Sequence, residues 1–212
     1  MTEKKKAIYL TTPIGEANWF KLIHPDEKFN KYQCDLILDD SPEVQSLMEK
    51  IEELTEDKVQ ELKGKAKNKA AANKIKDSGN RPIQPEYDDE GEETGRFVLK
   101  MSSPTEYKTK DGKVGKMYPP KIFDAAGKEI KGEPREELKV GSGTTMRANL
   151  ELRVYGNPSI GCGVSLRPKA VQIVELKEWG GASSGGGFDA VEGGFTMSEE
   201  ATFDNPGDSG DF

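Results

Sequence analysis

The sequence holds very few of the residues on which most catalytic sites depend. It contains one histidine, His24, and two cysteines, Cys34 and Cys162, among its 212 residues. His24 precedes Pro25 in an apparent turn, and no other histidine is present to activate a nucleophile. A structural zinc site needs about four ligands at paired spacing, which this chain does not offer. We therefore expect no catalytic residues, no metal site and no cofactor.

Motifs for nucleotide chemistry are missing as well. Segment 112–116 lacks the spacing and the final Ser or Thr of a phosphate-binding loop, and segment 141–143 lacks the third glycine and the following helix of a dinucleotide site. Asp88, Asp89 and Glu90 suggest a divalent-metal nuclease, but no second acidic motif on a strand completes such a site. Adjacent carboxylates on a loop are usually just solvated, so the nuclease is the weakest alternative.

No apolar run in the chain approaches the ~20 residues that cross a bilayer. The basic residues 4–6 are followed only by the short apolar segment 7–10, which does not make a signal peptide. We expect a soluble intracellular protein that contacts no membrane. In that setting the two cysteines are predicted to be reduced core thiols rather than a disulfide.

Basic residues are absent from the C-terminal segment. Residues 178–212 contain eight acids and no Lys or Arg, so the formal net charge of −7 becomes +1 for residues 1–177. The Gly- and Ser-rich stretch 180–187 is typical of a flexible linker, and the residues beyond it are too polar to form a core. We expect a Gly-rich linker and a disordered acidic tail. The tail either increases solubility or imitates nucleic-acid phosphates and offers Phe212 to partner proteins.

What the chain does contain is a series of strand patterns and one amphipathic helix. Apolar and polar side chains alternate over residues 29–38, and strand character returns at 96–101, 146–155 and 160–176. Ser41 and Pro42 predict the start of a helix that runs to about Leu62. Segment 79–95 is predicted to be a loop.

Two segments are rich in lysine. Residues 63–76 contain six lysines and no acid, which indicates either a solvated basic face or an arm that contacts phosphates. Tyr107 and Tyr118 enclose four lysines around the turn sequence Asp111-Gly112. Aromatic faces stack on unpaired bases while lysines neutralise the backbone, which is the combination that single-strand binding needs. A flexible basic loop beside core tyrosines is the alternative interpretation.

The pattern as a whole predicts a mainly β protein. At least five strands and a helix after an early strand favour an OB-fold-like Greek-key barrel. The glycines on both sides of Cys162 suggest a bulge or bend, as small barrels use to turn corners. The barrel is predicted in residues 1–177, with a helical insertion at about 42–77, and the tail in residues 178–212. A sandwich is the alternative, because patterning does not fix strand order.

Short motifs near both ends of the predicted domain carry a resemblance to a known family. They are KYQCDLIL at 31–38 followed by Pro42 and a helix, VYGN at 154–157, GCGVSL at 161–166, AVQIVEL at 170–176, and an acidic tail ending in Asp211-Phe212. In this order they resemble the single-stranded DNA-binding proteins of tailed bacteriophages. Residues 63–76 and the acidic loop around Gly91 have no such match.

The resemblance implies a non-enzymatic OB-fold protein that coats and protects single-stranded DNA in phage DNA replication, recombination and repair. It implies the cytoplasm of the infected bacterial host as the location. The tail is expected to compete with DNA and to recruit replication proteins such as DNA polymerase or helicase-primase through Asp208, Asp211 and Phe212. Double-stranded DNA and a homodimer are left open. The alternative function is an architectural or duplex-DNA-binding protein that uses the lysines of 63–76.

Candidate DNA contacts follow from side-chain chemistry rather than from the family. Aromatic residues that lie beside basic residues are expected to stack on nucleobases. The neighbouring lysines and arginines are expected to contact phosphates. The predicted stacking residues are Trp19, Tyr107, Tyr118, Phe123 and Tyr155. The predicted phosphate contacts are Lys100, Lys108, Lys110, Lys113, Lys116, Lys121, Arg147 and Arg153. Because the body is nearly neutral, these basic residues are expected to be segregated on one face.

Overall fold

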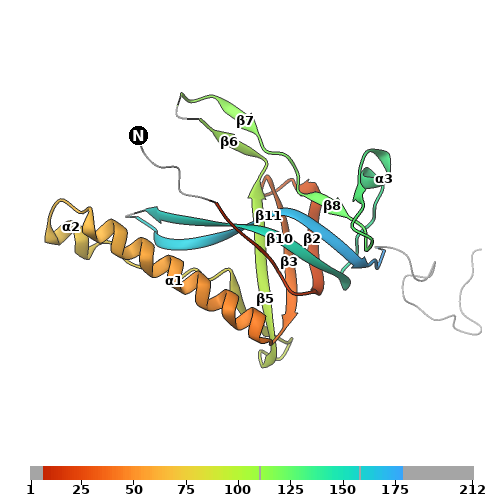
Figure 1. The fold of residues 1–212 in the computed structure, drawn as a ribbon, viewed down its shortest axis with the longest axis horizontal. Coiled ribbons are helices and arrows are strands. Elements are labelled where there is room, and N and C mark those ends of the chain that lie inside the picture. The colour runs from red at the N-terminus through yellow and green to blue at the C-terminus, as the bar shows by residue number, and fades with distance from the viewer. Residues whose placement is uncertain (1–6, 110, 158, 179–212) are drawn as a thin grey trace, which may run out of the picture. The chain divides into compact units, whose positions relative to one another are not determined.

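The computed structural model describes residues 7–109, 111–157 and 159–178. Its elements in chain order are β1 (Ile8–Thr11), β2 (Gly15–Asp26), β3 (Lys31–Asp39), α1 (Pro42–Gly64), α2 (Lys69–Asn73), β4 (Ile83–Tyr87), β5 (Glu93–Pro104), β6 (Glu106–Lys108), β7 (Val114–Lys116), β8 (Lys121–Phe123), β9 (Glu129–Ile130), α3 (Glu133–Glu136), β10 (Thr144–Asn157) and β11 (Gly161–Glu175). Strands dominate this part of the chain, which confirms the predicted mainly β class (Figure 1). Apart from Glu178, the predicted tail lies outside the described residues.

Five of the strands close into a barrel. β2 pairs with β3, β3 with β5, β5 with β11, β11 with β10, and β10 returns to β2. Four of these pairs are antiparallel, and β5 with β11 is parallel and aligns Met101 with Leu166. A five-stranded Greek-key barrel of this kind is an OB-fold. β1 extends the sheet beyond β10, while β8 and β9 extend it beyond β11.

Alternate residues of the barrel strands fill the core. Leu36 and Leu38 of β3 and Leu150 of β10 are almost fully buried, as the alternating pattern predicts. Burying each such side chain contributes ~1.5–3 kcal/mol, and a register slip of one residue would turn the whole row outward. Cys34 and Cys162 are also buried, and both are free, which confirms the prediction of core thiols.

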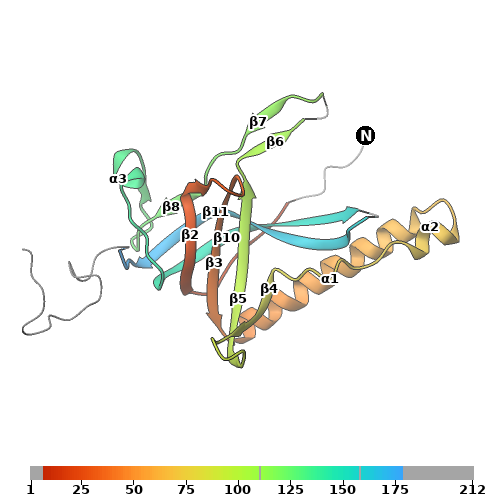
Figure 2. The ribbon, with the colours of Figure 1, turned by 180° about the vertical axis from the view of Figure 1, so that it is seen from behind.

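Helix α1 begins where the sequence predicts. The Ser41 hydroxyl accepts the N–H of Val44 at 3.3 Å, and Pro42 lies in the first turn. Val44 and Ile51 pack into the barrel core from the first half of the helix. The second half runs past the barrel beside the β10–β11 hairpin, as Figure 1 and Figure 2 both show. There Leu62 packs directly on Gly156, and a Cβ at that position would lie 2.5 Å from the Leu62 Cδ1 atom.

The far end of the β10–β11 hairpin is joined to the chain that follows α2. The Cys162 N–H donates to the Lys76 carbonyl at 2.9 Å, and the Ser78 N–H donates to the Cys162 carbonyl at 2.8 Å. A Cβ at Gly161 would lie 2.7 Å from the Ser78 nitrogen, so this close approach requires glycine. The pairing register is regular around Cys162, so the bulge that was one of two predictions for these glycines is wrong. The register irregularities of the hairpin occur nearer the barrel.

The β6–β7 hairpin extends from the end of β5. Tyr107 of β6 lies across Gly115 of β7 and leaves no room for a Cβ there. Gly112 has a φ of +79°, which confirms the predicted turn. The Thr105 N–H donates to the Asn30 carbonyl at 3.2 Å, so the base of this hairpin is attached to the turn between β2 and β3.

Segment 79–95 is not the loop that the sequence predicts. It contains β4, which pairs with β5 and buries Ile83. Pro85 is untypical of a strand because it has no backbone N–H to donate. β4 is an edge strand, where a missing N–H is tolerated. In the turn that follows, the Asp88 carboxylate accepts the N–H groups of Glu90 and Glu92 at 2.9 Å each. Within the described ranges, no group of three or more His, Cys, Asp or Glu side chains is arranged to hold a metal ion.

Candidate nucleic-acid interface

Side chains that point out of the barrel line up across neighbouring strands. The pairing of β3 with β5 sets Asp35 opposite Lys100. The parallel alignment of Leu166 with Met101 brings the outward residues of β11 beside those of β5, and β10 continues the row. We name this row the outer band, and its members are Lys21, Gln33, Asp35, Lys100, Ser102, Arg153, Ser165 and Arg167. β3 and β5 are the second and third strands of the barrel, whose face binds oligonucleotides in OB-folds.

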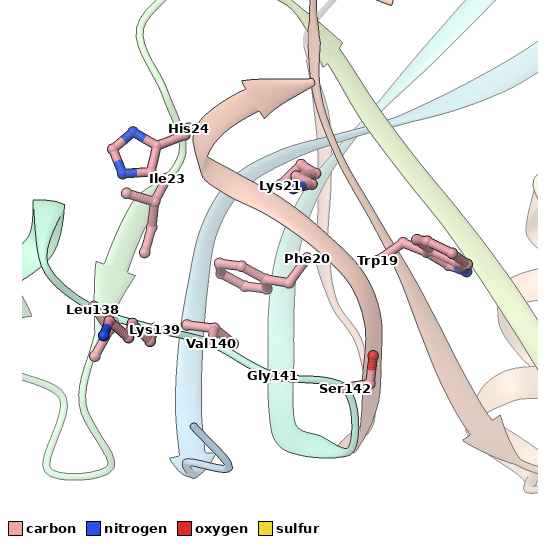
Figure 3. Close-up of a pocket in the computed structure, with 10 residues that line it drawn as sticks. All are labelled: Trp19, Phe20, Lys21, Ile23, His24, Leu138, Lys139, Val140, Gly141 and Ser142. Carbon is pink, nitrogen blue, oxygen red and sulfur yellow. The ribbon is translucent and has the colours of Figure 1, made fainter. Parts of the chain in front are cut away.

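Trp19 projects from β2 at one end of the outer band. It lies where the pairing of β2 with β3 is interrupted, and its φ of +51° is rare for a bulky side chain. The Asn18 side-chain oxygen accepts the Trp19 N–H and the Ser142 hydroxyl, each at 3.0 Å, which stabilises this backbone. The tryptophan is 71% exposed, whereas Phe20 points the opposite way into a pocket lined by Ile23 (Figure 3). Its aromatic face is thus held in solvent by the backbone.

The turn between β2 and β3 adds a second exposed aromatic side chain. Phe29 is 56% exposed, and its N–H donates to the Asp26 carboxylate at 3.1 Å. The ammonium groups of Lys28 and Lys31 lie 5.4 and 5.2 Å from the centre of the phenyl ring. The turn therefore offers a stacking face together with two cations. This group was not predicted from the sequence, although an aromatic residue between two lysines at a hairpin turn is a signal for it.

One carboxylate lies inside the outer band. Burial raises the pKa of Asp35, and the nearby Lys100 and Lys31 act in the opposite direction. In its ionised form this carboxylate weakens the attraction of the two lysines for phosphates. Because its pKa is raised, Asp35 takes up a proton at a higher pH than an ordinary aspartate, and the outer band becomes more positive as it does so.

A second carboxylate, that of Glu151, lies among the basic side chains of β10 and β11. Glu151 is buried and accepts hydrogen bonds from Arg153 at 3.2 Å and Lys169 at 3.0 Å. Burial opposes its charge, but the hydrogen bonds from Lys169 and Arg153 and the attraction of their charges together outweigh burial and lower the pKa of Glu151. Arg167 lies opposite Glu151, and burial together with Arg153 lowers the pKa of its guanidinium. Three cations around one anion leave two positive charges for a phosphate to neutralise.

The β6–β7 hairpin carries much of the predicted basic and aromatic segment. Its attachment to Asn30 places it beside the turn that holds Phe29. Tyr118, which follows β7, is 91% exposed. The other exposed predicted contacts of this hairpin are Tyr107, Lys108, Lys113 and Lys116. Lys110 lies outside the described residues.

Three predicted contacts lie away from the outer band, on the sheet formed by β8, β11 and the barrel end of β10. The Arg147 guanidinium donates to the Gln172 side chain at 2.8 Å, and Phe123 is half-buried opposite Gln172. Lys121 lies 3.5 Å from the Glu129 carboxylate. These side chains already have protein partners, and the structure does not bring them together with Trp19 or Lys100.

Tyr155 lies just beyond the end of the outer band on β10. It lies two residues beyond Arg153 on the same face, where it is half-buried, and its hydroxyl is 3.0 Å from the Ser78 hydroxyl. The structure therefore places it beside the band but gives its hydroxyl a structural partner. The predicted partner-binding residues Asp208, Asp211 and Phe212 lie outside the described residues.

The geometry suits an unpaired strand better than a duplex. Trp19 and Phe29 present aromatic faces on which single bases can stack, and the adjacent lysines and arginines can neutralise the backbone. Bases inside a duplex are already stacked and paired and cannot use those faces. Fold and surface together define a nucleic-acid-binding protein of the OB-fold class. No helix in the described part of the chain is long and apolar enough to cross a membrane.

Comparison with known protein families assigns the chain to one of them. Residues 17–176 match the family model described as "Single-stranded DNA-binding protein, Bacteriophage T7". The match covers well over half of the chain, so the chain belongs to this family of single-stranded DNA-binding proteins. The resemblance predicted from the sequence is thereby confirmed, and the function of the family is binding rather than catalysis. A comparison with curated protein sequences found no match.

Solved structures agree on the fold. The single-stranded DNA-binding protein gp2.5 of bacteriophage T7 superimposes with a TM-score of 0.66 at 20% identity, covering 91% of this chain and 100% of that one. A C-terminally truncated single-stranded DNA-binding protein of bacteriophage Enc34 gives a TM-score of 0.51 at 16% identity, covering 84% and 95%. At these identities the likeness establishes the OB-like fold, which confirms the predicted fold class.

Proposed function

We propose that the protein coats and protects single-stranded DNA by holding bases on Trp19 and Phe29 and phosphates along the outer band. The observation that carries this proposal is the exposed Trp19, fixed by a left-handed backbone at the edge of a basic OB-fold face. The predicted contacts Lys100 and Arg153 belong to the same band. Tyr107 and Tyr118, with the lysines of the β6–β7 hairpin, extend it beyond the turn that holds Phe29.

Competition between two nucleic acids tests the proposal directly. A fluorescently labelled oligo-dT is bound first, and unlabelled single-stranded or duplex DNA of the same length is added while anisotropy is recorded. We expect the single strand to displace the probe at a much lower concentration than the duplex. Equal displacement by the duplex would instead support the architectural or duplex-binding alternative.

Protection of the strand serves phage DNA replication, recombination and repair, and the site of action that we propose is the cytoplasm of the infected bacterium. A single-strand-specific nuclease measures protection in vitro. At saturating protein, oligo-dT should resist digestion. Unchanged digestion at full occupancy would contradict the coating role.

The acidic residues beyond Glu178 are proposed to compete with DNA for the outer band. A tethered polyanion has a high effective concentration near its own cations. Removal of residues 179–212 should therefore raise the affinity for oligo-dT, most clearly at low salt, where screening is weakest. Identical affinities across a salt series would remove this competition.

Recruitment of replication proteins such as DNA polymerase or helicase-primase is the second role proposed for the tail, with Asp208, Asp211 and Phe212 as contacts. Phe212→Ala should abolish co-sedimentation with the polymerase while oligo-dT binding is retained. Double-stranded DNA and a homodimer stay predictions. The competition above decides the first, and sedimentation velocity of the free protein decides the second.

A further inference from the structure

A group of lysines at the end of α1 takes no part in the outer band. The group, which we name the lysine tip, consists of Lys63, Lys65, Lys67, Lys69, Lys74 and Lys76, and each of these residues is exposed. Among them, Lys65 is the member for which the described structure holds an ion pair, at 2.7 Å from Glu61. The remaining positive charge faces solvent.

The nearest acid on the C-terminal side does not neutralise the lysine tip. Both carboxylate oxygens of Asp77 are taken by the Arg81 guanidinium, at 3.0 and 2.6 Å. These hydrogen bonds from Arg81 outweigh burial and lower the pKa of Asp77, so the pair stays ionised and satisfied across the neutral range. No acid lies between Glu61 and Asp77 in the sequence. The tip is therefore a local excess of positive charge.

The lysine tip is fixed to the hairpin on which the outer band ends. The backbone hydrogen bonds between Cys162 and the segment from Lys76 to Ser78 tie its C-terminal side to β11. Helix α1 positions its N-terminal side, and at ~1.5 Å per residue its 23 residues carry the tip about 35 Å from the start of the helix. Figure 1 and Figure 2 show α2 at the far end of the β10–β11 hairpin.

The outer band and the lysine tip meet at Tyr155. This residue follows Arg153 on the outward face of β10, and its hydroxyl contacts Ser78, two residues after Lys76. A single strand of DNA that follows the band from Lys100 to Arg153 therefore reaches the lysine tip. The tip itself contains no aromatic residue between positions 63 and 78, so it can bind phosphates but cannot stack on bases.

We propose that the lysine tip is a second phosphate-binding segment that holds a single strand where it leaves the outer band. This inference rests on the proposed function, because it requires the strand to follow the band first. A short strand fills the band alone, whereas a longer strand reaches both segments. The contribution of the tip is sequence-independent and salt-dependent, since each neutralised phosphate of a single strand adds about 0.7 to the slope of log affinity against log salt.

The test compares two variants of the full-length protein that carry the same change in net charge. The tip variant is Lys69→Gln, Lys74→Gln and Lys76→Gln, and the control variant is Lys50→Gln, Lys128→Gln and Lys177→Gln, all at exposed lysines. Each is titrated with an oligo-dT inside the ~4–16 nucleotides that one OB-fold covers and with one about twice as long. Excess oligonucleotide keeps one protein on each strand, and circular dichroism checks the fold.

We expect the tip variant to bind the short oligonucleotide like the parent protein and the long one about tenfold more weakly. Its salt slope on the long strand should fall by up to about 2, for three lost phosphate contacts. The control variant should match the parent on both strands. Equal weakening on both lengths, or no weakening on either, overturns the proposal. So does weaker binding of duplex DNA with unchanged binding of the long single strand, which makes the tip a duplex site.

A further variant separates failure of this inference from failure of the proposed function. Trp19→Ala removes the aromatic face at the end of the outer band and should weaken binding of the short and the long oligonucleotide alike. If Trp19→Ala weakens binding of both oligonucleotides while the tip variant binds like the parent protein, the proposed function is supported and the proposed second segment is refuted. If Trp19→Ala leaves both unchanged, the proposed function itself fails.

Discussion

The outer band and the lysine tip are both basic, but they differ in what surrounds the charge. Beside the band, Trp19 and Phe29 present aromatic faces, and the carboxylates Asp35 and Glu151 offset the positive charge of the nearby lysines and arginines. The tip has lysines without aromatic residues, spread from the last turn of α1 through α2 to the segment that follows it. Aromatic faces respond to bases, and isolated ammonium groups respond to phosphates. The number of positive charges alone therefore does not locate the base-binding part of the surface.

Loss of a stacking face should have the largest effect. Trp19→Ala removes one aromatic platform, and stacking contributes ~1–3 kcal/mol per base, so affinity for oligo-dT should fall about 5- to 150-fold. Anisotropy titrations at fixed salt measure it. Tyr87→Ala is the matched control. Tyr87 is an exposed aromatic residue away from the band, and its hydroxyl donates a hydrogen bond to the Glu93 carboxylate. A similar loss in both variants would show that exposed aromatics matter without regard to place.

Loss of one cation in the band should have a smaller effect of a different kind. Lys100→Gln removes one phosphate contact, so the salt slope should fall by about 0.7 and the affinity should drop a few-fold. A salt series with oligo-dT separates slope from affinity. Trp19→Ala, in contrast, should leave the slope nearly unchanged. If Lys100→Gln also leaves the slope unchanged, Lys100 does not contact the backbone.

Loss of the carboxylate within the band should strengthen binding. Asp35→Asn leaves Lys100 and Lys31 without their opposing charge, so affinity should rise a few-fold at neutral pH and low salt. The parent protein should gain affinity as the pH falls toward the raised pKa of Asp35, and the variant should lose this dependence. The sign for stability is the same: protonation relieves a buried charge, so Asp35 destabilises the fold less at lower pH. A pH dependence that survives in Asp35→Asn would contradict this assignment.

The smallest effect is expected outside the band. Arg147 is held by Gln172 on the sheet next to β8, so Arg147→Gln should change affinity by less than about twofold. Arg153→Gln, on the same strand but inside the band, is the matched comparison and should behave like Lys100→Gln. If the two arginine variants weaken binding equally, DNA extends along the outward face of β10 to Arg147, and the outer band as defined is too short.

Local patterns gave much of the fold. Alternation identified the buried faces of β3 and β10, and Ser41 with Pro42 located the start of α1. The edge strand β4 was missed because its proline and the acids around it resemble a loop. The bulge expected at Cys162 was wrong because the glycines there serve a close approach by Ser78, a contact between residues more than eighty positions apart.

The candidate site was predicted in fragments. Trp19, Lys100 and Arg153 carry their chemistry in the sequence, but only strand pairing shows that they are neighbours and that Arg147 lies farther along β10, opposite Gln172. Arg167 joins Lys100 through the parallel pairing of β11 with β5, which no local pattern encodes. Phe29 was overlooked because it was assigned to the start of a strand, whereas its exposure depends on the turn formed with Asp26.

The most direct test of the account is the fluorescence of Trp19 during titration with oligo-dT. Trp179→Phe removes the other tryptophan, so the signal comes from Trp19 alone. The account predicts strong, saturable quenching at the stoichiometry found by anisotropy, reversed by added salt. Binding by anisotropy without any change in Trp19 fluorescence would contradict it, because the strand would then occupy a surface other than the outer band.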